Sequence, residues 1–137
     1  MRVVIDNNVI IDALKPNPLH ETEAQEILLL ASAKAIDGFI SANSMTDIFY
    51  VLRKAHGADK TKSLLHSLLS LLDVIGIKPE DCTTALDKPI SDFEDALVDV
   101  CADNIGADCI VSRDAEFLKA KTAVEVITPS QLLAKVN

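Results

Sequence analysis

A short run of β-branched residues that ends in a carboxylate is the feature that most constrains the fold of this chain. Val3, Val4 and Ile5 follow one another without a polar residue between them, and Asp6 comes next. Such a run is typical of a strand covered on both faces, as in a parallel sheet flanked by helices. Because the ligand crevice of an open α/β sheet lies beyond the carboxyl ends of its strands, Asp6 is a candidate site residue. It can equally cap a following helix, since a carboxylate accepts hydrogen bonds from free backbone amides.

The rest of the chain alternates between segments with helical spacing and short apolar runs. Helices are predicted from residue 21, from a cap at Ser44, from a cap at Asp59, over 79–86, over 92–104 and from Pro129, with a short helical turn over 116–119. Strands are predicted at 3–5, 39–41, 74–77, 109–112 and 124–127. This alternation predicts an α/β fold, with a single doubly wound parallel sheet of about five strands flanked by helices.

Length and composition limit the possible classes of protein. The 137 residues fit a single domain spanning 1–137. No apolar stretch approaches the roughly 20 residues that a membrane span needs, and no signal-peptide pattern is present. Three cysteines without close pairing indicate neither a disulfide framework nor a zinc site, so a cytoplasmic location is expected. The net charge of −8 argues against a broad basic surface for nucleic acid, but fits a metal site or a basic partner.

Four acids fall at the ends of predicted elements. Asp6 and Asp114 follow the first and fourth strands, and Asp47 and Asp95 lie in the first turns of two helices. If these two strands are neighbours, the four carboxylates can converge, and they would repel one another unless a cation lies among them. Mg²⁺ or Mn²⁺ is the expected cation, because both prefer oxygen ligands and keep waters that leave room for a phosphate. The pattern predicts metal-assisted hydrolysis of phosphodiester bonds.

Each acid also has a purely structural interpretation. Asp47 could complement a helix N-terminus, and Asp114 could be a turn residue. Ser91 and Glu94 have the spacing of a capping box at the start of the helix over 92–104. Three further acids of that helix are interpreted as a solvated face: Asp92, Asp99 and Asp103.

At these residues the chain resembles the PIN-domain family of metal-dependent nucleases. The sequence of residues 3–8 is similar to the family's first motif, an apolar strand that ends in Asp and is followed by Asn. Residues 44–54 resemble its second acidic motif, and residues 92–97 and 107–117 resemble the third and fourth. The resemblance covers essentially the whole chain, and the ordered set of motifs is more specific than any one of them.

The resemblance implies an acidic tetrad and its supporting residues. The tetrad would be Asp6, Asp47, Asp95 and Asp114, with Asn8 bracing Asp6 and Ser112 orienting the pocket. Two residues depart from the usual pattern: Asp47 stands where members often have Glu, and Asn7 replaces a hydroxyl residue. The resemblance further implies strand order 3-2-1-4-5, an RNA substrate, a homodimer and, for chains of this size, a VapC-type toxin whose antitoxin partner blocks the site with its tail.

Substrate phosphate would have to meet a few local cations, for which Arg113, Arg53 and Lys54 are the candidates. Arg53 and Lys54 can equally be exposed residues favoured by a helix C-terminus. Three other functions compete with the nuclease. A receiver-type magnesium-binding signalling domain needs acids and a Lys that residues 77–79 and 127–129 do not supply, and a haloacid-dehalogenase-type phosphatase needs a second acid at Asn8. A PIN-like fold kept as a non-catalytic interaction module is the remaining alternative.

Overall fold

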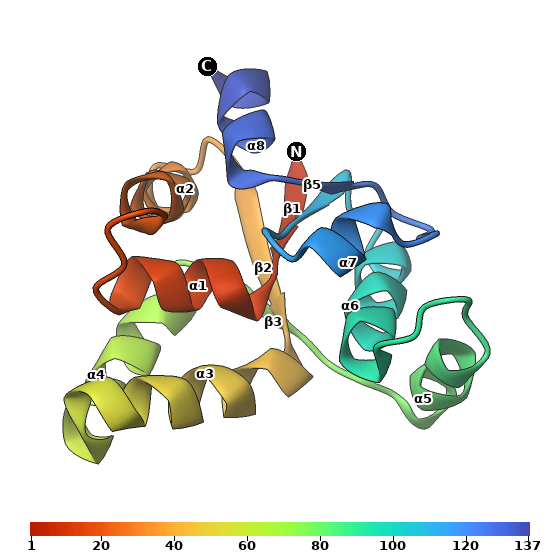
Figure 1. The fold of residues 1–137 in the computed structure, drawn as a ribbon, viewed down its shortest axis with the longest axis horizontal. Coiled ribbons are helices and arrows are strands. Elements are labelled where there is room, and N and C mark those ends of the chain that lie inside the picture. The colour runs from red at the N-terminus through yellow and green to blue at the C-terminus, as the bar shows by residue number, and fades with distance from the viewer.

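A five-stranded parallel sheet forms the centre of the computed structural model, which describes residues 1–137 (Figure 1). The strands are β1 (Arg2–Ile5), β2 (Asp37–Ser41), β3 (Asp73–Ile75), β4 (Cys109–Val111) and β5 (Val126–Ile127). Their order is β3-β2-β1-β4-β5, and every neighbouring pair is parallel. The structure confirms the predicted fold class and strand order, and it places β1 at the middle of the sheet.

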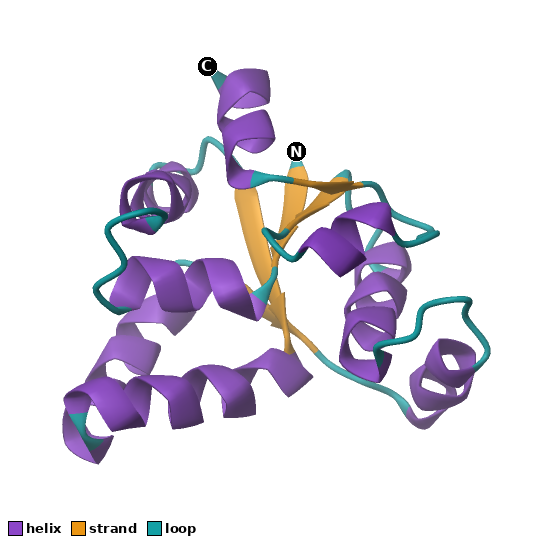
Figure 2. Ribbon diagram, viewed as in Figure 1, coloured by secondary structure: helices purple, strands orange, loops and turns teal.

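Eight helices surround the sheet (Figures 1 and 2). They are α1 (Asn7–Leu14), α2 (Glu21–Ser32), α3 (Ala42–His56), α4 (Ala58–Leu69), α5 (Pro79–Leu86), α6 (Phe93–Asn104), α7 (Ala115–Lys119) and α8 (Pro129–Val136). One face carries α1 to α4 and α8, and the other carries α6 and α7, with α5 packed against α6. None of these helices combines the length and the apolar composition that a membrane span requires.

The position of β1 in the middle of the sheet explains why its sequence is apolar without alternation. Val3 and Ile5 pack into the core beneath α1 to α4, whereas Val4 packs on the opposite side against α6 and α7. All three side chains are at most 1% exposed. Successive strand residues point to opposite faces, so a strand with helices on both sides needs an apolar residue at every position. The end of β1 is therefore fixed from both faces, which makes the place of the next residue well defined.

Helix α3 starts earlier than the sequence predicts. Ser41 is its N-cap residue, so the prediction that Ser44 caps it is wrong. Ser44 is instead buried one turn into the helix, where its hydroxyl shares a 2.9 Å hydrogen bond with that of Ser41. Asp47 consequently lies in the second turn rather than the first. Because a helix dipole acts mainly within the first turn, the dipole gives little reason for an acid at this position.

Helix α6 is capped by Asp92, whose carboxylate accepts a 3.0 Å hydrogen bond from the backbone N–H of Asp95. The predicted capping box of Ser91 and Glu94 is therefore wrong. The prediction of a solvated face is also wrong for Asp99, whose side chain is fully buried. Asp103, on the same helix, is exposed as predicted.

Asp99 is a structural acid that joins three segments. Its carboxylate accepts hydrogen bonds from the Lys88 ammonium at 2.8 Å and from the backbone N–H groups of Ala123 and Val124 at 2.9 and 3.0 Å. The ion pair ties the loop after α5 to α6, and the two amide bonds tie α6 to the segment that enters β5. The sequence contains no signal for this role, because the partners are 11 to 25 residues away.

We predict that Asp99→Asn lowers the free energy of unfolding by about 3 kcal/mol, because it leaves a largely buried ammonium without its counter-charge. Urea denaturation followed by circular dichroism measures the change. Asp103→Asn, on the exposed side of the same helix, is the matched control and should change stability by less than about 0.5 kcal/mol. Equal stabilities for the two variants would contradict the structural role of Asp99.

Candidate active site

A cleft of about 340 Å³ lies at the carboxyl ends of β1 and β4, between α1, α3 and α6. All four acids predicted from the sequence line it, and two more acids join them. The acids are Asp6, Asp47, Asp92, Glu94, Asp95 and Asp114. The other lining residues are Asn7, Asn8, Ile11 and Val51. The structure therefore gathers the predicted acids at one place, and the rest of the cleft wall contains no basic side chain.

Asp6 both caps a helix and belongs to the cleft. One carboxylate oxygen accepts a 2.9 Å hydrogen bond from the backbone N–H of Asn7, at the start of α1. The other accepts hydrogen bonds from the Asn8 amide at 3.1 Å and the Ser112 hydroxyl at 2.8 Å. Burial raises the pKa of Asp6, and the hydrogen bonds from Ser112 and Asn7 only partly oppose this effect. The two interpretations of Asp6 are thus compatible, and Asn8 and Ser112 both hold its carboxylate.

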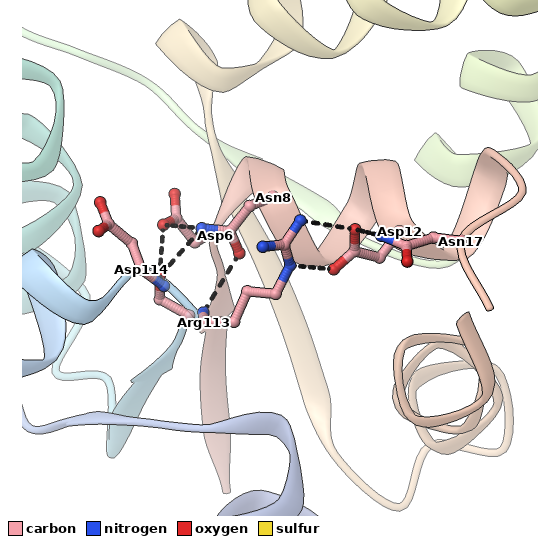
Figure 3. Close-up of polar contacts among 7 residues, drawn as sticks. Asp6, Asn8, Asp12, Asn17, Arg113 and Asp114 are labelled. Carbon is pink, nitrogen blue, oxygen red and sulfur yellow. Dashed lines mark hydrogen bonds and ion pairs between the residues drawn. The ribbon is translucent and has the colours of Figure 1, made fainter. Parts of the chain in front are cut away.

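Asp114 comes to the cleft from the turn that follows β4. Because β1 and β4 are adjacent and parallel, residues more than one hundred positions apart in sequence end side by side. The backbone N–H of Asp114 donates to the Ser112 hydroxyl at 3.1 Å, and its carboxylate accepts a 3.0 Å hydrogen bond from the N–H of Glu116 at the start of α7. Figure 3 shows the Asp6 and Asp114 side chains next to each other.

Asp95 is the cleft acid whose carboxylate has the fewest hydrogen-bond donors. Its backbone N–H bonds to Asp92, but its carboxylate accepts no hydrogen bond from the protein. Burial raises its pKa to about 7, and the negative charges of Asp6, Asp92 and Asp114 add to the shift. A carboxylate that lacks protein donors and is surrounded by like charges gains from binding either a proton or a metal cation.

Glu94 and Asp92 are the two cleft acids that the sequence did not predict, and Glu94 makes contacts across the cleft. The Asn7 amide donates to Glu94 at 2.6 Å and to Asp47 at 3.3 Å, so one side chain of α1 joins α3 to α6. Burial raises the pKa of Glu94 to about 8, and a hydrogen bond and repulsion involving Asp47 add to this. One feature of the sequence indicates this role: Asn7, next to Asp6, has an amide group that needs hydrogen-bond acceptors. The capping-box interpretation gives Glu94 a purely local role instead.

None of the three candidate phosphate ligands lines the cleft. Arg53 and Lys54 lie exposed in the last turn of α3, where basic residues complement the helix C-terminus. The Arg113 guanidinium pairs with Asp12 of α1 through Nε at 2.5 Å and Nη2 at 3.0 Å. This pairing raises the pKa of Arg113. The negative charge of the cleft is thus not balanced by a cation of the chain at its wall.

The donor set fits a hard divalent cation. All six charged lining residues offer oxygen, which Mg²⁺ and Mn²⁺ prefer, and Asp95 is available as a direct ligand. In this arrangement no three acidic, His or Cys side chains are close enough to hold one metal ion together. Mg²⁺ commonly uses one or two carboxylates and keeps several waters, so the wider spacing suits a partly hydrated ion.

Comparisons with known proteins show the family and the fold of this chain. The family model described as "PIN domain" matches residues 2–116. Ribonuclease VapC1 of Aquifex aeolicus is 27% identical over 143 aligned positions, covering 99% of this chain and 96% of the relative. A structure of VapBC2 from Rickettsia felis bound to a promoter DNA fragment has a TM-score of 0.71 at 19% identity, covering 93% of this chain and 98% of that one. A toxin-antitoxin complex from Klebsiella pneumoniae has a TM-score of 0.69 at 18% identity, covering 93% and 97%.

We predict that the metal-free protein loses stability as pH rises from about 5 to about 8. The pKa values of Asp95 and Glu94 are about 7 and about 8 in the folded protein, against ordinary values near 4. The unfolded chain therefore releases these protons first, and the free energy of unfolding falls across this window before levelling off. Melting curves in chelator measure the slope. Asp95→Asn should flatten it while Asp103→Asn leaves it unchanged; a wild-type slope in Asp95→Asn would contradict the crowding of the acids.

Proposed function

Because this chain belongs to the PIN-domain family, we propose that it is an endoribonuclease that hydrolyses RNA phosphodiester bonds with Mg²⁺ or Mn²⁺. The observation that carries the proposal is a cleft with six carboxylates and no basic side chain, at the edge of the sheet where α/β proteins bind ligands. The similarity to a ribonuclease along nearly the whole chain supports RNA as the substrate. The same family membership disfavours the receiver and phosphatase alternatives, and the full set of acids disfavours a non-catalytic module.

The proposed roles follow from the contacts. Asp6, Asp95 and Asp114 would hold the metal, one or two of them directly and the rest through its waters, with Asp47 acting directly or through water. Asn8 and the Ser112 hydroxyl orient the Asp6 carboxylate through their hydrogen bonds. A bound divalent cation would lower the pKa of a coordinated water and neutralise charge that develops on the phosphate.

Glu94 would have a different role. With a pKa of about 8 it keeps its proton at neutral pH, so it reduces repulsion with Asp47 while it accepts the Asn7 amide. Its contacts hold α1, α3 and α6 together around the cleft, and in the proposal this keeps Asp47 facing the other acids.

The proposal extends to the biological setting. We propose that residues 1–137 act as one nuclease unit, as a homodimer, in the cytoplasm. The similarity to structures of VapBC proteins and of a toxin-antitoxin complex supports a role as the toxin of a toxin-antitoxin pair. A reducing compartment is compatible with the two buried thiols, Cys101 and Cys109, whose pKa values burial raises to about 11.

Purified protein should cleave RNA when Mg²⁺ or Mn²⁺ is present and should be inactive in chelator. Asp6→Asn and Asp95→Asn should each lower the rate by at least about 100-fold, since each removes a charge that would hold the cation. Gel analysis of labelled RNA measures cleavage, and sequencing the RNA ends gives the cut site. Asp103→Asn, which is exposed and outside the cleft, should cleave like the wild type. Cleavage that survives both chelator and Asp6→Asn would disprove the proposal.

Toxicity can be tested separately from catalysis in solution. Induced expression of the wild-type chain in a bacterial host should arrest growth, whereas Asp95→Asn at the same protein level should not, because it keeps the shape of the cleft but loses a ligand. Growth curves with matched protein amounts on immunoblots provide the measurement. Equal growth of the two cultures would contradict a toxin role while leaving the nuclease proposal open to the cleavage assay.

A further inference from the structure

The ion pair between Arg113 and Asp12 is the one strong electrostatic contact beside the cleft that the proposed chemistry does not use. It is two-pronged, with Nε and Nη2 of the guanidinium meeting the two carboxylate oxygens at 2.5 and 3.0 Å. The Asp12 side chain is only 4% exposed, whereas that of Arg113 is 40% exposed. The Asn17 amide adds a 2.8 Å hydrogen bond to Oδ1 of Asp12, the oxygen that also accepts from Nη2 of Arg113. Planar, two-point contacts of this kind fix the orientation of both partners.

The pair belongs to a continuous line of contacts between α1 and the turn after β4. Asn8 and Asp12 are four residues apart, and therefore lie on the same face of α1. Asn8 accepts the backbone N–H of Arg113 at 3.3 Å, and its amide donates to the Ser112 hydroxyl at 3.1 Å. Both residues that precede Asp114 are thus bonded to this face. Figure 3 shows the Arg113 side chain extending toward Asp12, away from the carboxylates of Asp6 and Asp114.

The turn that carries Asp114 needs these contacts in order to stay close to β1. Its carboxylate lies beside that of Asp6, and like charges push the two apart. Its own side chain bonds only to the N–H of Glu116, within the same turn. Nothing in that local bond sets the distance between the turn and β1, so the distance depends on the contacts made by Ser112 and Arg113.

We propose that Asp12 and Arg113 are positioning residues, which hold the turn after β4 against α1 so that the Asp114 carboxylate stays beside Asp6 in the active cleft. This inference rests on the proposed nuclease function and deepens it. It assigns Arg113 to the scaffold of the site instead of to substrate phosphate. To contact phosphate with the same two nitrogens, Arg113 would have to leave a buried carboxylate unpaired, which is strongly unfavourable.

The test compares Arg113→Gln, Asp12→Asn and the double variant, using RNA cleavage with saturating Mn²⁺ at a temperature where circular dichroism shows every variant folded. Each single variant should lower kcat by about 10- to 100-fold through misplacement of Asp114, with KM changed less than about twofold. The double variant should be no worse than either single one, because both remove the same contact. Asp99→Asn is the matched control: it breaks a buried ion pair outside the cleft, and should lose stability but keep kcat.

A second measurement separates positioning from phosphate binding. The dependence of RNA affinity on salt, measured in chelator by fluorescence anisotropy, should have the same slope in wild type, Arg113→Gln and Asp12→Asn. If Arg113 contacts phosphate, Arg113→Gln alone should lower the slope by about one contact and raise KM, while Asp12→Asn stays close to wild type. That result, or unchanged kcat in both single variants, overturns the inference.

Failure of the nuclease proposal would give a different set of results. A wild-type protein that does not cleave RNA with either metal would disprove the nuclease function, and with it any role in placing a catalytic acid. If the wild type is active but only one of the two single variants has a lowered kcat, only the positioning role is disproved. If Asp12→Asn does not fold, Arg113→Gln still decides between the two roles through its kcat, KM and salt slope, because it replaces the more exposed partner.

Discussion

Repulsion among carboxylates is the constraint on which the rest of this structure depends. Six acids line one cleft whose wall contains no basic side chain, and burial and mutual repulsion raise the pKa values of Asp6, Asp95 and Glu94. The fold holds these charges together through rigid neighbours: β1 is buried on both faces, and α1, α3 and α6 are tied to one another by Asn7. Repulsion among the acids lowers the stability of the folded protein at the place where a cation and a phosphate would bind. Such a loss of stability is common at functional sites.

The parts of the site that can be predicted are those fixed by local sequence and parallel topology. Val3 to Ile5 predict a strand buried on both faces, and a parallel sheet places the residues after its strands along one edge. The sequence therefore places Asp6 and Asp114 along the same edge of the sheet, and the two acids meet only if β1 and β4 are neighbours. Asp95 can be placed less directly, because the first turn of a helix points its side chains toward the preceding loop. The order of the strands comes from the family resemblance, since nothing in the periodicity of the chain determines which strands are neighbours.

The parts that cannot be predicted depend on contacts between distant segments. Glu94 matches a local capping pattern, but Asp92 takes the cap, and Glu94 meets the Asn7 amide 87 residues away. Asp99 has the pattern of a solvated residue because its charge is matched only after folding brings Lys88 and the backbone before β5 to it. Charged residues on an amphipathic helix are usually solvated, so a buried exception leaves no periodic signal. Both errors come from assigning a polar side chain to a local partner or to solvent when its partners lie in distant segments.

Calorimetric titration of the metal-free protein with Mn²⁺, without RNA, tests the central claim most directly. If the crowded acids form a cation site, the wild type should bind Mn²⁺ saturably at neutral pH, and Asp6→Asn and Asp95→Asn should each weaken binding by about tenfold or more. Asp103→Asn has the same change of charge on the exposed side of α6, and should bind like the wild type. Absence of binding by the wild type, or equal affinities in Asp95→Asn and Asp103→Asn, would contradict the account.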